Sequence, residues 1–386
     1  MQVTKTIKYV GVNDHDIDLF EGQYDVRENG MAYNSYVVIG EKVAVTDTVD
    51  AHFVNEWLGN VEAVLDGRTP DYLIVHHMEP DHSAGIAAFM EQYPQAQIVA
   101  SKMAFKMMAA YFGTDFSDRQ IVCKEGFELD LGGRTLRFIG AVNVHWPEVM
   151  FSYDSQDKVL FSADAFGKFG ANDIEDPEGW ACEARRYYFG IVGKFGKNVQ
   201  AVLQKVAALD VEYICPLHGP VLSENLTYYV ETYTTWSNYE PEDHGVTIAY
   251  ASVYGHTKQA VEELAGALRE KGETVSLFDL ARDDMAEAVE DAFRYDRLVL
   301  ASITYAGDIF PFMTTFIHTL AEHAYQNRKV AFIESGTWAP VAAKAMRAQV
   351  EQMAGIEFAE TVVTVRGSVD EAARAQIAAL ANELSE

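Results

Sequence analysis

The segment HHMEPDHS, residues 76–83, is the densest group of potential metal ligands in this 386-residue sequence. It follows an apolar run and places two imidazoles and two carboxylates within six positions, at His77, Glu79, Asp81 and His82. Carboxylates packed together with neutral imidazoles are costly unless a cation compensates their charge. The segment therefore predicts a metal-binding loop at the carboxyl end of a strand.

Three more residues of ligand type follow apolar β-like runs and precede small or turn-forming residues: His145, Asp164 and His218. A single histidine at a strand end is more often structural than catalytic, so neither histidine would indicate a site by itself. The compact run at 77–82 changes that balance, and we expect these three residues to join its site.

The combined ligand set contains imidazole and several carboxylates but no cysteine. Such a set suits non-haem iron, manganese or a hydrolytic zinc pair. Seven candidate ligands suit two ions better than one and leave open positions for a small molecule between the ions. A natural allocation gives each ion its own group and shares one carboxylate: the first ion takes His77, Glu79 and His145, the second takes Asp81, His82 and His218, and Asp164 bridges them.

A second chemistry is indicated near the other end of the sequence, where three loops follow apolar β-like runs. The first loop, in ASVYGHTKQ (251–259), offers backbone N–H groups and hydroxyls to a phosphate at the start of a helix. The other two, in 302–313 and 333–340, offer aromatic faces and backbone hydrogen bonds to a flat flavin ring. The residues expected to bind the flavin are Ser252, Val253, Tyr254, Gly255, His256, Thr257, Thr304, Tyr305, Ala306, Gly307, Ser335, Gly336, Thr337 and Trp338.

A plain helix cap is the alternative interpretation of the first flavin loop. Trp338 favours the flavin, because a tryptophan beside Gly-Thr in a loop is unusual as a core residue. The sequence contains neither GxGxxG nor GxxxxGK[ST], so neither a dinucleotide-binding fold nor an NTPase loop is indicated.

The pattern of the sequence changes near residue 240. Before it, short β-like runs alternate with turns and a few helices, and Gly132-Gly133 indicates a hairpin turn. The polar segment 237–245 is a plausible linker. After it, helical segments alternate with apolar runs, which predicts a doubly wound parallel sheet. These runs are 246–251, 274–279, 297–302, 329–334 and 361–365. We therefore expect two α/β domains, 1–240 and 241–386.

Composition restricts the class of protein further. Apolar residues make up 49% of the chain, which is ordinary for a globular protein. No apolar run approaches the roughly 20 residues that span a bilayer, and the N-terminal segment has no signal-peptide core. Cys123, Cys182 and Cys215 are too few and too widely spaced for a disulfide framework. These features favour a cytoplasmic protein without a membrane partner.

The formal net charge of −28 bears on possible partners. A polyanion would be repelled, so nucleic acid is a poor candidate. The acidic balance indicates either a solubility surface or steering of a cationic partner.

The series from His77 to His218 resembles the metallo-β-lactamase fold, an αβ/βα sandwich whose strand-end loops hold two metals. Zinc hydrolases of that fold typically show HxHxDH, whereas this sequence has Glu79 in place of the middle histidine. A carboxylate there adds negative charge and hard oxygen donation, which stabilises the higher-valent ions of a redox cycle.

Several segments resemble those of flavodiiron proteins, or A-type flavoproteins, in which the same carboxylate replacement is found. The flavin loops resemble the FMN-binding loops of flavodoxins, although Thr337 stands where many members have glycine. Tyr187 and Tyr188 are expected either at the iron pocket or in the core, and Gly190 stands where the family has asparagine. The segments that carry the resemblance are HWPE (145–148), FSADAFG (161–167), RRYYFGIVGKF (185–195) and PLHGP (216–220).

The resemblance covers nearly the whole chain and implies two non-haem iron ions and one FMN. FMN takes electrons singly or in pairs, and two ferrous ions deliver two more, so the protein would hold four. Four electrons reduce O2 to two waters without releasing peroxide, and two NO molecules become N2O and water after a two-electron reduction. The resemblance implies one or both of these activities.

The same resemblance implies partners. In the family a head-to-tail homodimer brings each flavin to its neighbour's iron site, and we expect such a dimer, or a dimer of dimers, here. The sequence contains no C-terminal rubredoxin domain, so the electron donor is expected to be a separate rubredoxin-like protein or a reduced soluble cofactor.

Two other classes of protein remain open on the sequence. A di-zinc hydrolase of the metallo-β-lactamase fold with an accessory flavodoxin-like domain is disfavoured by Glu79, and metal analysis would reveal it. A flavoprotein electron carrier with a structural metal site is disfavoured by the open coordination positions. Turnover with O2 or NO distinguishes this carrier from an enzyme.

Overall fold

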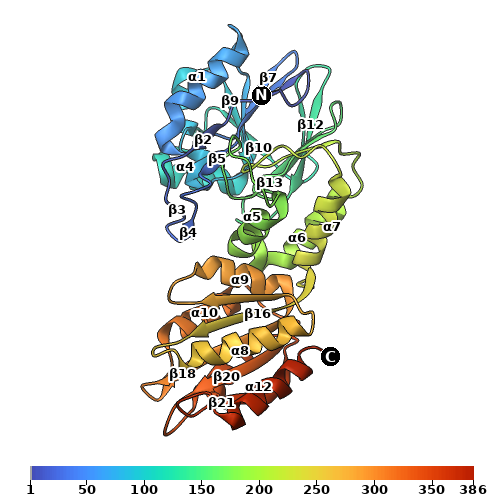
Figure 1. Cartoon of the computed structure of the whole chain (residues 1–386). Coiled ribbons are helices and arrows are strands. Elements are labelled where there is room, and N and C mark those ends of the chain that lie inside the picture. Colours follow the sequence, from blue (N-terminus) through green and yellow to red (C-terminus); the bar gives the residue numbers. More distant parts are fainter. Residues whose placement is uncertain (1) are drawn as a thin grey trace. The chain divides into compact units, whose positions relative to one another are not determined.

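The computed structural model describes residues 2–386 of the chain. The chain divides into two compact units, Met1–Thr234 and Thr235–Glu386, each with its own sheets and core (Figure 1).

The first unit is built on two facing sheets that share one apolar core. Ile74 and Val99 of the first sheet lie in the same buried cluster as Phe138 and Phe161 of the second. The first sheet has the order β1 (Ile7–Tyr9), β6 (Tyr36–Ile39), β7 (Val43–Thr46), β8 (Tyr72–Val75), β9 (Gln97–Ser101) and β10 (Gln120–Cys123). The second has the order β11 (Glu128–Asp130), β12 (Thr135–Gly140), β13 (Met150–Asp154), β14 (Val159–Phe161) and β15 (Tyr213–Cys215).

Helices lie against both sheets of this sandwich. The helix α4 (Lys102–Phe112) packs against β9, and α6 (Gly196–Val206) packs against β12. The other helical segments are η1 (Ala51–Phe53), α1 (Val54–Leu65), α2 (Pro80–Ser83), α3 (Ile86–Gln92), α5 (Trp180–Tyr187), the π-helix η2 (Tyr188–Val192), η3 (Gly193–Phe195) and α7 (Leu226–Ser237). Two small sheets pair β2 (Val12–Asp14) with β5 (Met31–Tyr33) and β3 (Leu19–Phe20) with β4 (Tyr24–Asp25).

The hairpin predicted at Gly132-Gly133 is confirmed. The strands β11 and β12 pair antiparallel on either side of it. Both glycines have positive φ angles, 76° and 72°, which a tight hairpin turn requires and which glycine adopts without a steric penalty.

The second unit is a parallel sheet with the strand order of the flavodoxin-like doubly wound fold. The order is β17 (Val275–Asp279), β16 (Asp243–Ala251), β18 (Tyr295–Tyr305), β20 (Lys329–Ser335) and β21 (Glu357–Val365), with the short β19 (Asp308–Ile309) paired antiparallel to β18. The apolar runs predicted as strands coincide with these elements, except that the run 274–279 begins one residue before β17. The segment expected as a linker, 237–245, differs in part, because β16 already begins at Asp243.

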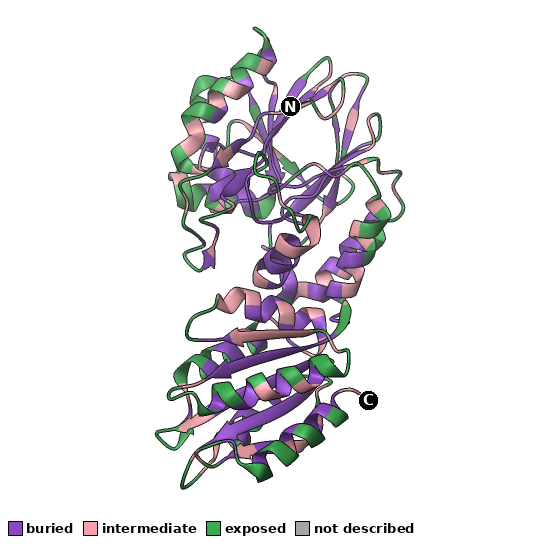
Figure 2. Ribbon diagram, viewed as in Figure 1, coloured by how far each residue is buried: buried purple, intermediate pink, exposed green. Residues whose placement is uncertain are grey.

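Helices pack against this sheet through apolar stripes, and the strands between them are largely buried (Figure 2). The predicted stripe of α8 (His256–Glu270) is confirmed, since Ala260, Val261, Leu264, Ala265 and Leu268 are buried in one cluster. The helix α12 (Glu371–Glu383) contributes Ile377 and Leu380 to that cluster. The remaining helices are α9 (Met285–Arg294), α10 (Pro311–Glu322) and α11 (Ala342–Val350).

Together the units confirm the predicted fold class, an αβ/βα sandwich followed by a flavodoxin-like sheet. Within residues 2–386, no helix has the length and apolar character needed to cross a membrane.

Candidate metal centre and flavin pocket

The predicted metal ligands lie in four loops at strand ends of the first unit. The segment with His77 follows β8, and His145 lies between β12 and β13. Asp164 follows β14, and His218 follows β15. The structure brings these loops together and sorts the side chains into two groups whose ligand atoms lie within 4.8 Å of one another: His77, Glu79, His145 and Asp164 in one, and Asp81, His82 and His218 in the other.

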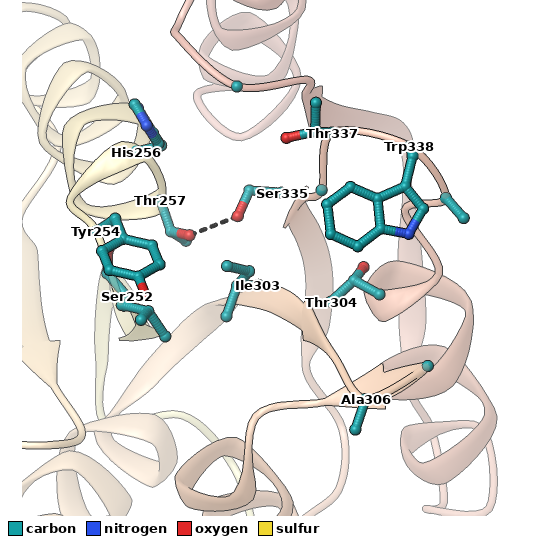
Figure 3. A pocket seen from close by; sticks show the side chains of 15 residues that line it. Ser252, Tyr254, His256, Thr257, Ile303, Thr304, Ala306, Ser335, Thr337 and Trp338 are labelled. Carbon is teal, nitrogen blue, oxygen red and sulfur yellow. Dashed lines mark hydrogen bonds between the residues drawn. The ribbon is translucent and has the colours of Figure 1, made fainter.

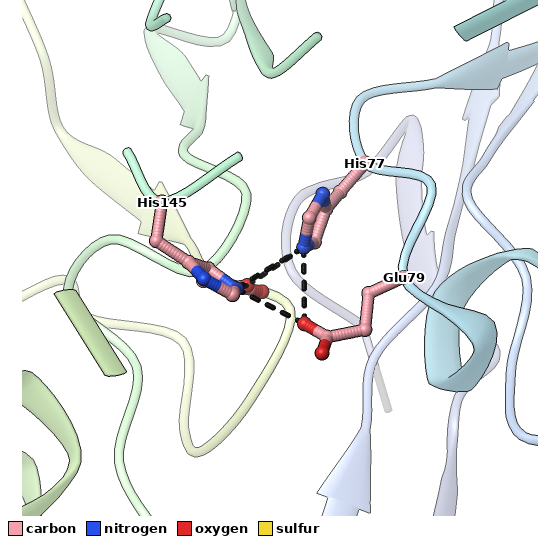
Figure 4. A group of neighbouring side chains, drawn as sticks. His77, Glu79 and His145 are labelled. Carbon is pink, nitrogen blue, oxygen red and sulfur yellow. Dashed lines mark hydrogen bonds and ion pairs between the residues drawn. The ribbon is translucent and has the colours of Figure 1, made fainter. Parts of the chain in front are cut away.

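The first group converges on a small space bounded by nitrogen and oxygen atoms (Figure 4). His77 Nε2 lies 3.2 Å from Glu79 Oε2 and 3.3 Å from His145 Nε2. His145 Nε2 lies 3.0 Å from the same Glu79 oxygen. Three atoms of ligand type therefore face each other at the corners of a triangle, as they would around a single ion.

The second group has the same character. His82 Nε2 lies 3.0 Å from His218 Nε2. Asp81 Oδ2 lies 3.3 Å from each of these nitrogens. The rings of Phe20, Tyr33 and Tyr187 pack around His218 and limit its movement.

Asp164 joins the two groups through its two oxygens. Its Oδ2 lies 3.2 Å from His77 Nε2 and 3.1 Å from His145 Nε2. Its Oδ1 lies 3.3 Å from His82 Nε2 and 3.9 Å from His218 Nε2. Each oxygen thus faces a different group, which is the arrangement expected of a carboxylate that bridges two ions.

The chemistry of this donor set fits a pair of cations. Both oxygens of Asp81 and both oxygens of Asp164 are buried without a hydrogen-bond partner in the part of the chain that the structure describes. Buried polar atoms are normally paired, and a bound ion is one explanation when they are not.

The pKa values of the cluster also indicate that its carboxylates need positive charge nearby. Burial opposes the charged form of Asp164, yet the neighbouring His77 and other histidines hold the pKa of Asp164 well below its ordinary value. Burial alone would lower the pKa of His77, but Asp164, Glu148 and Glu79 raise it well above its ordinary value. The pKa of His145 is raised to about 9, against the effect of burial, by Asp164 and Glu79. Protons on these rings compensate charge that metal ions would compensate in the loaded protein.

Two carboxylates that the sequence analysis did not single out hold the metal-binding loop. Asp47 Oδ1 accepts backbone N–H groups of His76 at 2.7 Å and His77 at 3.3 Å, and Asp47 Oδ2 lies 2.6 Å from His76 Nδ1. Glu148 Oε1 accepts the Met78 N–H at 2.8 Å and lies 2.8 Å from His77 Nδ1. Both come from segments distant in sequence, and only the HWPE motif pointed to one of them.

Tyr187 and Tyr188, expected either at the iron pocket or in the core, pack against different rings. Tyr187 packs its ring on His218, with the ring centroids 5.4 Å apart. Tyr188, the residue considered for a supporting role at the iron pocket, packs on Tyr233 at 5.0 Å. Nearby, a Cβ atom at Gly190 would lie 2.8 Å from ring atoms of Tyr24, so an asparagine there would require Tyr24 to move.

The flavin loops of the second unit meet around a cavity of about 440 Å³ (Figure 3). This size is within the usual range for a cofactor or small-molecule site. The predicted residues that line it are Ser252, Val253, Tyr254, His256, Thr257, Thr304, Ala306, Gly307, Ser335, Gly336, Thr337 and Trp338. Ile303, Ala339 and Gly367 also line it, and the sequence analysis did not include them.

The first flavin loop has the backbone geometry of an anion site. Gly255 has a φ of 94° and directly precedes α8, so the chain turns there in a conformation that favours glycine. Ser252 Oγ accepts the N–H groups of Gly255 at 3.2 Å and Lys258 at 3.3 Å, which fixes the turn. Thr257 and Ser335 hydroxyls lie 2.8 Å apart and join the first loop to the third.

Exposed aromatic rings border the cavity. Trp338 is 90% exposed and Tyr254 is 86% exposed, so each offers a free face for stacking on a flat ring. Tyr305 was expected to offer a face together with Trp338, but it is not among the described residues that line the cavity. Its ring packs instead on Phe310, with the centroids 5.1 Å apart.

Comparison with known proteins supports the fold of both units of the chain. The family model described as ODP family beta lactamase matches residues 31–219, and the flavodoxin domain model matches residues 247–373. A putative diflavin flavoprotein A 2 of Synechocystis is 35% identical over 71% of this chain, and the chain spans 48% of that relative's length. An anaerobic nitric oxide reductase flavorubredoxin of Vibrio vulnificus is 29% identical over 94% of this chain and 75% of its own length.

A solved structure matches over the full length. The rubredoxin oxygen:oxidoreductase of Desulfovibrio gigas superposes with a TM-score of 0.92 at 26% identity, covering 100% of this chain and 97% of that one. Fold and site together define a two-part protein in which a metallo-β-lactamase-like metal domain precedes a flavodoxin-like domain. In its two domains and their order the chain is similar to the flavodiiron proteins.

Replacing His145 with alanine removes one nitrogen ligand from the first group, and replacing His218 with alanine removes one from the second group. We expect each variant to lose metal, because both side chains offer a nitrogen at the contact distances given above. Metal content per chain measured by inductively coupled plasma mass spectrometry should fall by about half or more, while FMN content stays the same. The control is His15→Ala, which removes a half-exposed histidine from the same unit. Loss of FMN with full retention of metal would contradict the assignment.

Replacing Trp338 with alanine tests the flavin pocket. The variant should bind FMN about tenfold more weakly, because an exposed aromatic face for stacking is lost. Fluorescence titration of flavin-depleted protein with FMN measures this change, and the metal content should not move. Phe312→Ala removes another exposed ring of the second unit and should leave the affinity unchanged. Equal FMN affinity in Trp338→Ala and the unmodified protein would exclude stacking on this ring.

Proposed function

We propose that the protein is a flavodiiron oxidoreductase that reduces O2 to water, NO to N2O, or both, at a non-haem di-iron centre supplied with electrons through FMN from an external donor. The observation that carries this proposal is Asp164, whose two oxygens face separate groups of ligands. Homologues of the same family act on NO or O2 according to their names, including a nitric oxide reductase flavorubredoxin and a rubredoxin oxygen:oxidoreductase.

We assign the two irons to the residues predicted from the sequence. The first group supplies His77, Glu79 and His145, the second supplies Asp81, His82 and His218, and Asp164 is shared. When bound, the irons and FMN supply the electrons for the reduction. The chain's own contribution is to hold these ligands, to bury them from bulk water and to leave one side open to a small molecule.

Glu79 favours redox chemistry over hydrolysis. Its Oε2 lies within 3.2 Å of both imidazoles of the first group, where it adds negative charge to the ligand set. Hard, anionic oxygen donors suit iron in its higher oxidation state. The di-zinc hydrolase alternative lacks such support, and neither compared relative is named as a hydrolase.

We propose that the predicted flavin residues bind FMN in the cavity of the second unit. Backbone N–H groups at the start of α8 face the phosphate, and Trp338 and Tyr254 stack on the ring system. The exposure of these two rings supports the assignment, because large aromatic side chains are seldom left so accessible without a partner.

The partners and location follow from the same proposal. We propose a head-to-tail homodimer, or a dimer of dimers, in which the metal domain 1–240 of one copy receives electrons from the flavin domain 241–386 of its neighbour. The donor is a rubredoxin-like protein or a reduced soluble cofactor. The net charge of −28 favours a donor that is less acidic than this chain. We place the protein in the cytoplasm, where free thiols such as those of Cys123, Cys182 and Cys215 persist.

Asp164→Asn tests the function directly. Asparagine keeps the size of the side chain but removes the charge that two ions share, so O2 and NO consumption by the anaerobically photoreduced protein should fall at least about tenfold. Oxygen and NO electrodes measure the rates, and flavin reduction by the donor should be unaffected.

Asp154→Asn provides a matched control, since Asp154 is a fully buried carboxylate that pairs with Arg134. It should retain both activities if it folds with the same metal content. An unmodified protein that holds iron and FMN but consumes neither gas would contradict the proposed function.

A further inference from the structure

Glu148 lies behind His77, on the side of the ring opposite the other ligands. His77 Nε2 faces Glu79, His145 and Asp164, whereas its Nδ1 lies 2.8 Å from Glu148 Oε1. A carboxylate only accepts hydrogen bonds, so in the neutral ring that binds a metal the proton lies on Nδ1 and the Nε2 lone pair faces the ligand cluster. The tautomer that can bind a metal is therefore fixed by Glu148.

The environment of Glu148 makes this contact strong. Its side chain is fully buried, as is that of His77. Its Oε1 is held by the Met78 N–H at 2.8 Å, and its Oε2 has no hydrogen-bond partner within the described part of the chain. With little water to screen it, the negative charge acts chiefly on the imidazole that it contacts.

Within the described residues, the second ligand group has no equivalent carboxylate. His218 Nδ1 donates instead to the backbone carbonyl of Ala32 at 2.8 Å. His82 Nδ1 is buried without a hydrogen-bond partner among residues 2–386. In the first group the outer nitrogen of His77 thus meets a full charge, whereas in the second group the outer nitrogens meet a neutral carbonyl or, among the described residues, no hydrogen-bond partner.

We propose that Glu148 is a positioning residue that makes the two halves of the centre inequivalent. By drawing the Nδ1 proton of His77 toward itself, Glu148 makes that imidazole a stronger electron donor. Glu148 therefore favours the ferric state in the first group, so the first added electron resides in the second group. This inference rests on the proposed function, because it requires two irons.

The test is Glu148→Gln in the complete protein carrying iron and FMN. Glutamine keeps an oxygen that can accept from His77 Nδ1 and Met78 N–H but removes the charge. An anaerobic redox titration followed by EPR measures the yield of the half-integer-spin signal of the one-electron-reduced centre. The one-electron-reduced centre is in equilibrium with the fully oxidised and the two-electron-reduced centres. We expect the equilibrium constant for forming the one-electron-reduced centre from these two to fall about tenfold, because the two halves become more alike. The flavin midpoint should stay where it is.

Mössbauer spectroscopy of the ⁵⁷Fe-loaded protein distinguishes the proposed role of Glu148 from a purely structural one, because a purely structural role would not change the spectrum of one iron alone. In the one-electron-reduced state of Glu148→Gln, the ferric quadrupole doublet should shift while the ferrous doublet keeps its parameters. The control Asp154→Asn removes a buried carboxylate that pairs with Arg134 and should change neither doublet.

The outcomes separate this inference from the proposed function. If Glu148→Gln holds two irons and shows the unmodified EPR yield and ferric doublet, the role of Glu148 is wrong while the function stands. If the unmodified protein holds no iron pair, both fail. Should Glu148→Gln not retain two irons, Glu148→Asp replaces it, since the shorter side chain cannot reach His77 and Met78 together. An unchanged EPR yield in Glu148→Asp would also overturn the inference.

Discussion

The metal domain depends on the compensation of buried negative charge. Asp164 is almost fully enclosed and faces imidazole nitrogens on both sides. Burial of a carboxylate is unfavourable unless positive charge lies close to it, and here the available charge is either protons on histidines or bound cations. The pKa of Asp164 is lowered and the pKa of His77 is raised for the same reason, because each group stabilises the charged form of the other. Two cations held by the seven proposed ligands would meet the need for positive charge.

The surrounding fold holds the buried, charged ligand side chains together without relying on the ions. Strands with buried apolar side chains end next to one another and deliver the ligand loops to one place. Asp47 pins the backbone of the first loop, Glu148 fixes the ring of His77, and the carbonyl of Ala32 fixes the ring of His218. His77 and His218 are thus each oriented by a contact that is itself buried, which limits the rearrangement needed on metal binding. The flavin pocket follows a different principle, since its aromatic rings remain exposed until a ring system covers them.

The fold and most of the ligand geometry could be predicted because they depend on local patterns. Apolar runs indicated the strands, and the spacing of His77, Glu79, Asp81 and His82 indicated that one loop holds four of the seven candidate ligands. The roles of Asp47 and Glu148 could not be derived, because each reaches the loop from a segment distant in sequence, and sequence spacing does not reveal these contacts. Tyr305 was expected at the flavin for its residue type, and its contact with the ring of Phe310 could not be read from the sequence.

The central claim is that the protein carries two irons and one FMN, and elemental analysis with flavin quantification tests it most directly. Protein purified without air, from cells grown in iron-supplemented medium, should contain two irons and one FMN per chain. Two zinc ions per chain with little flavin under the same conditions would contradict the account and would indicate a hydrolase.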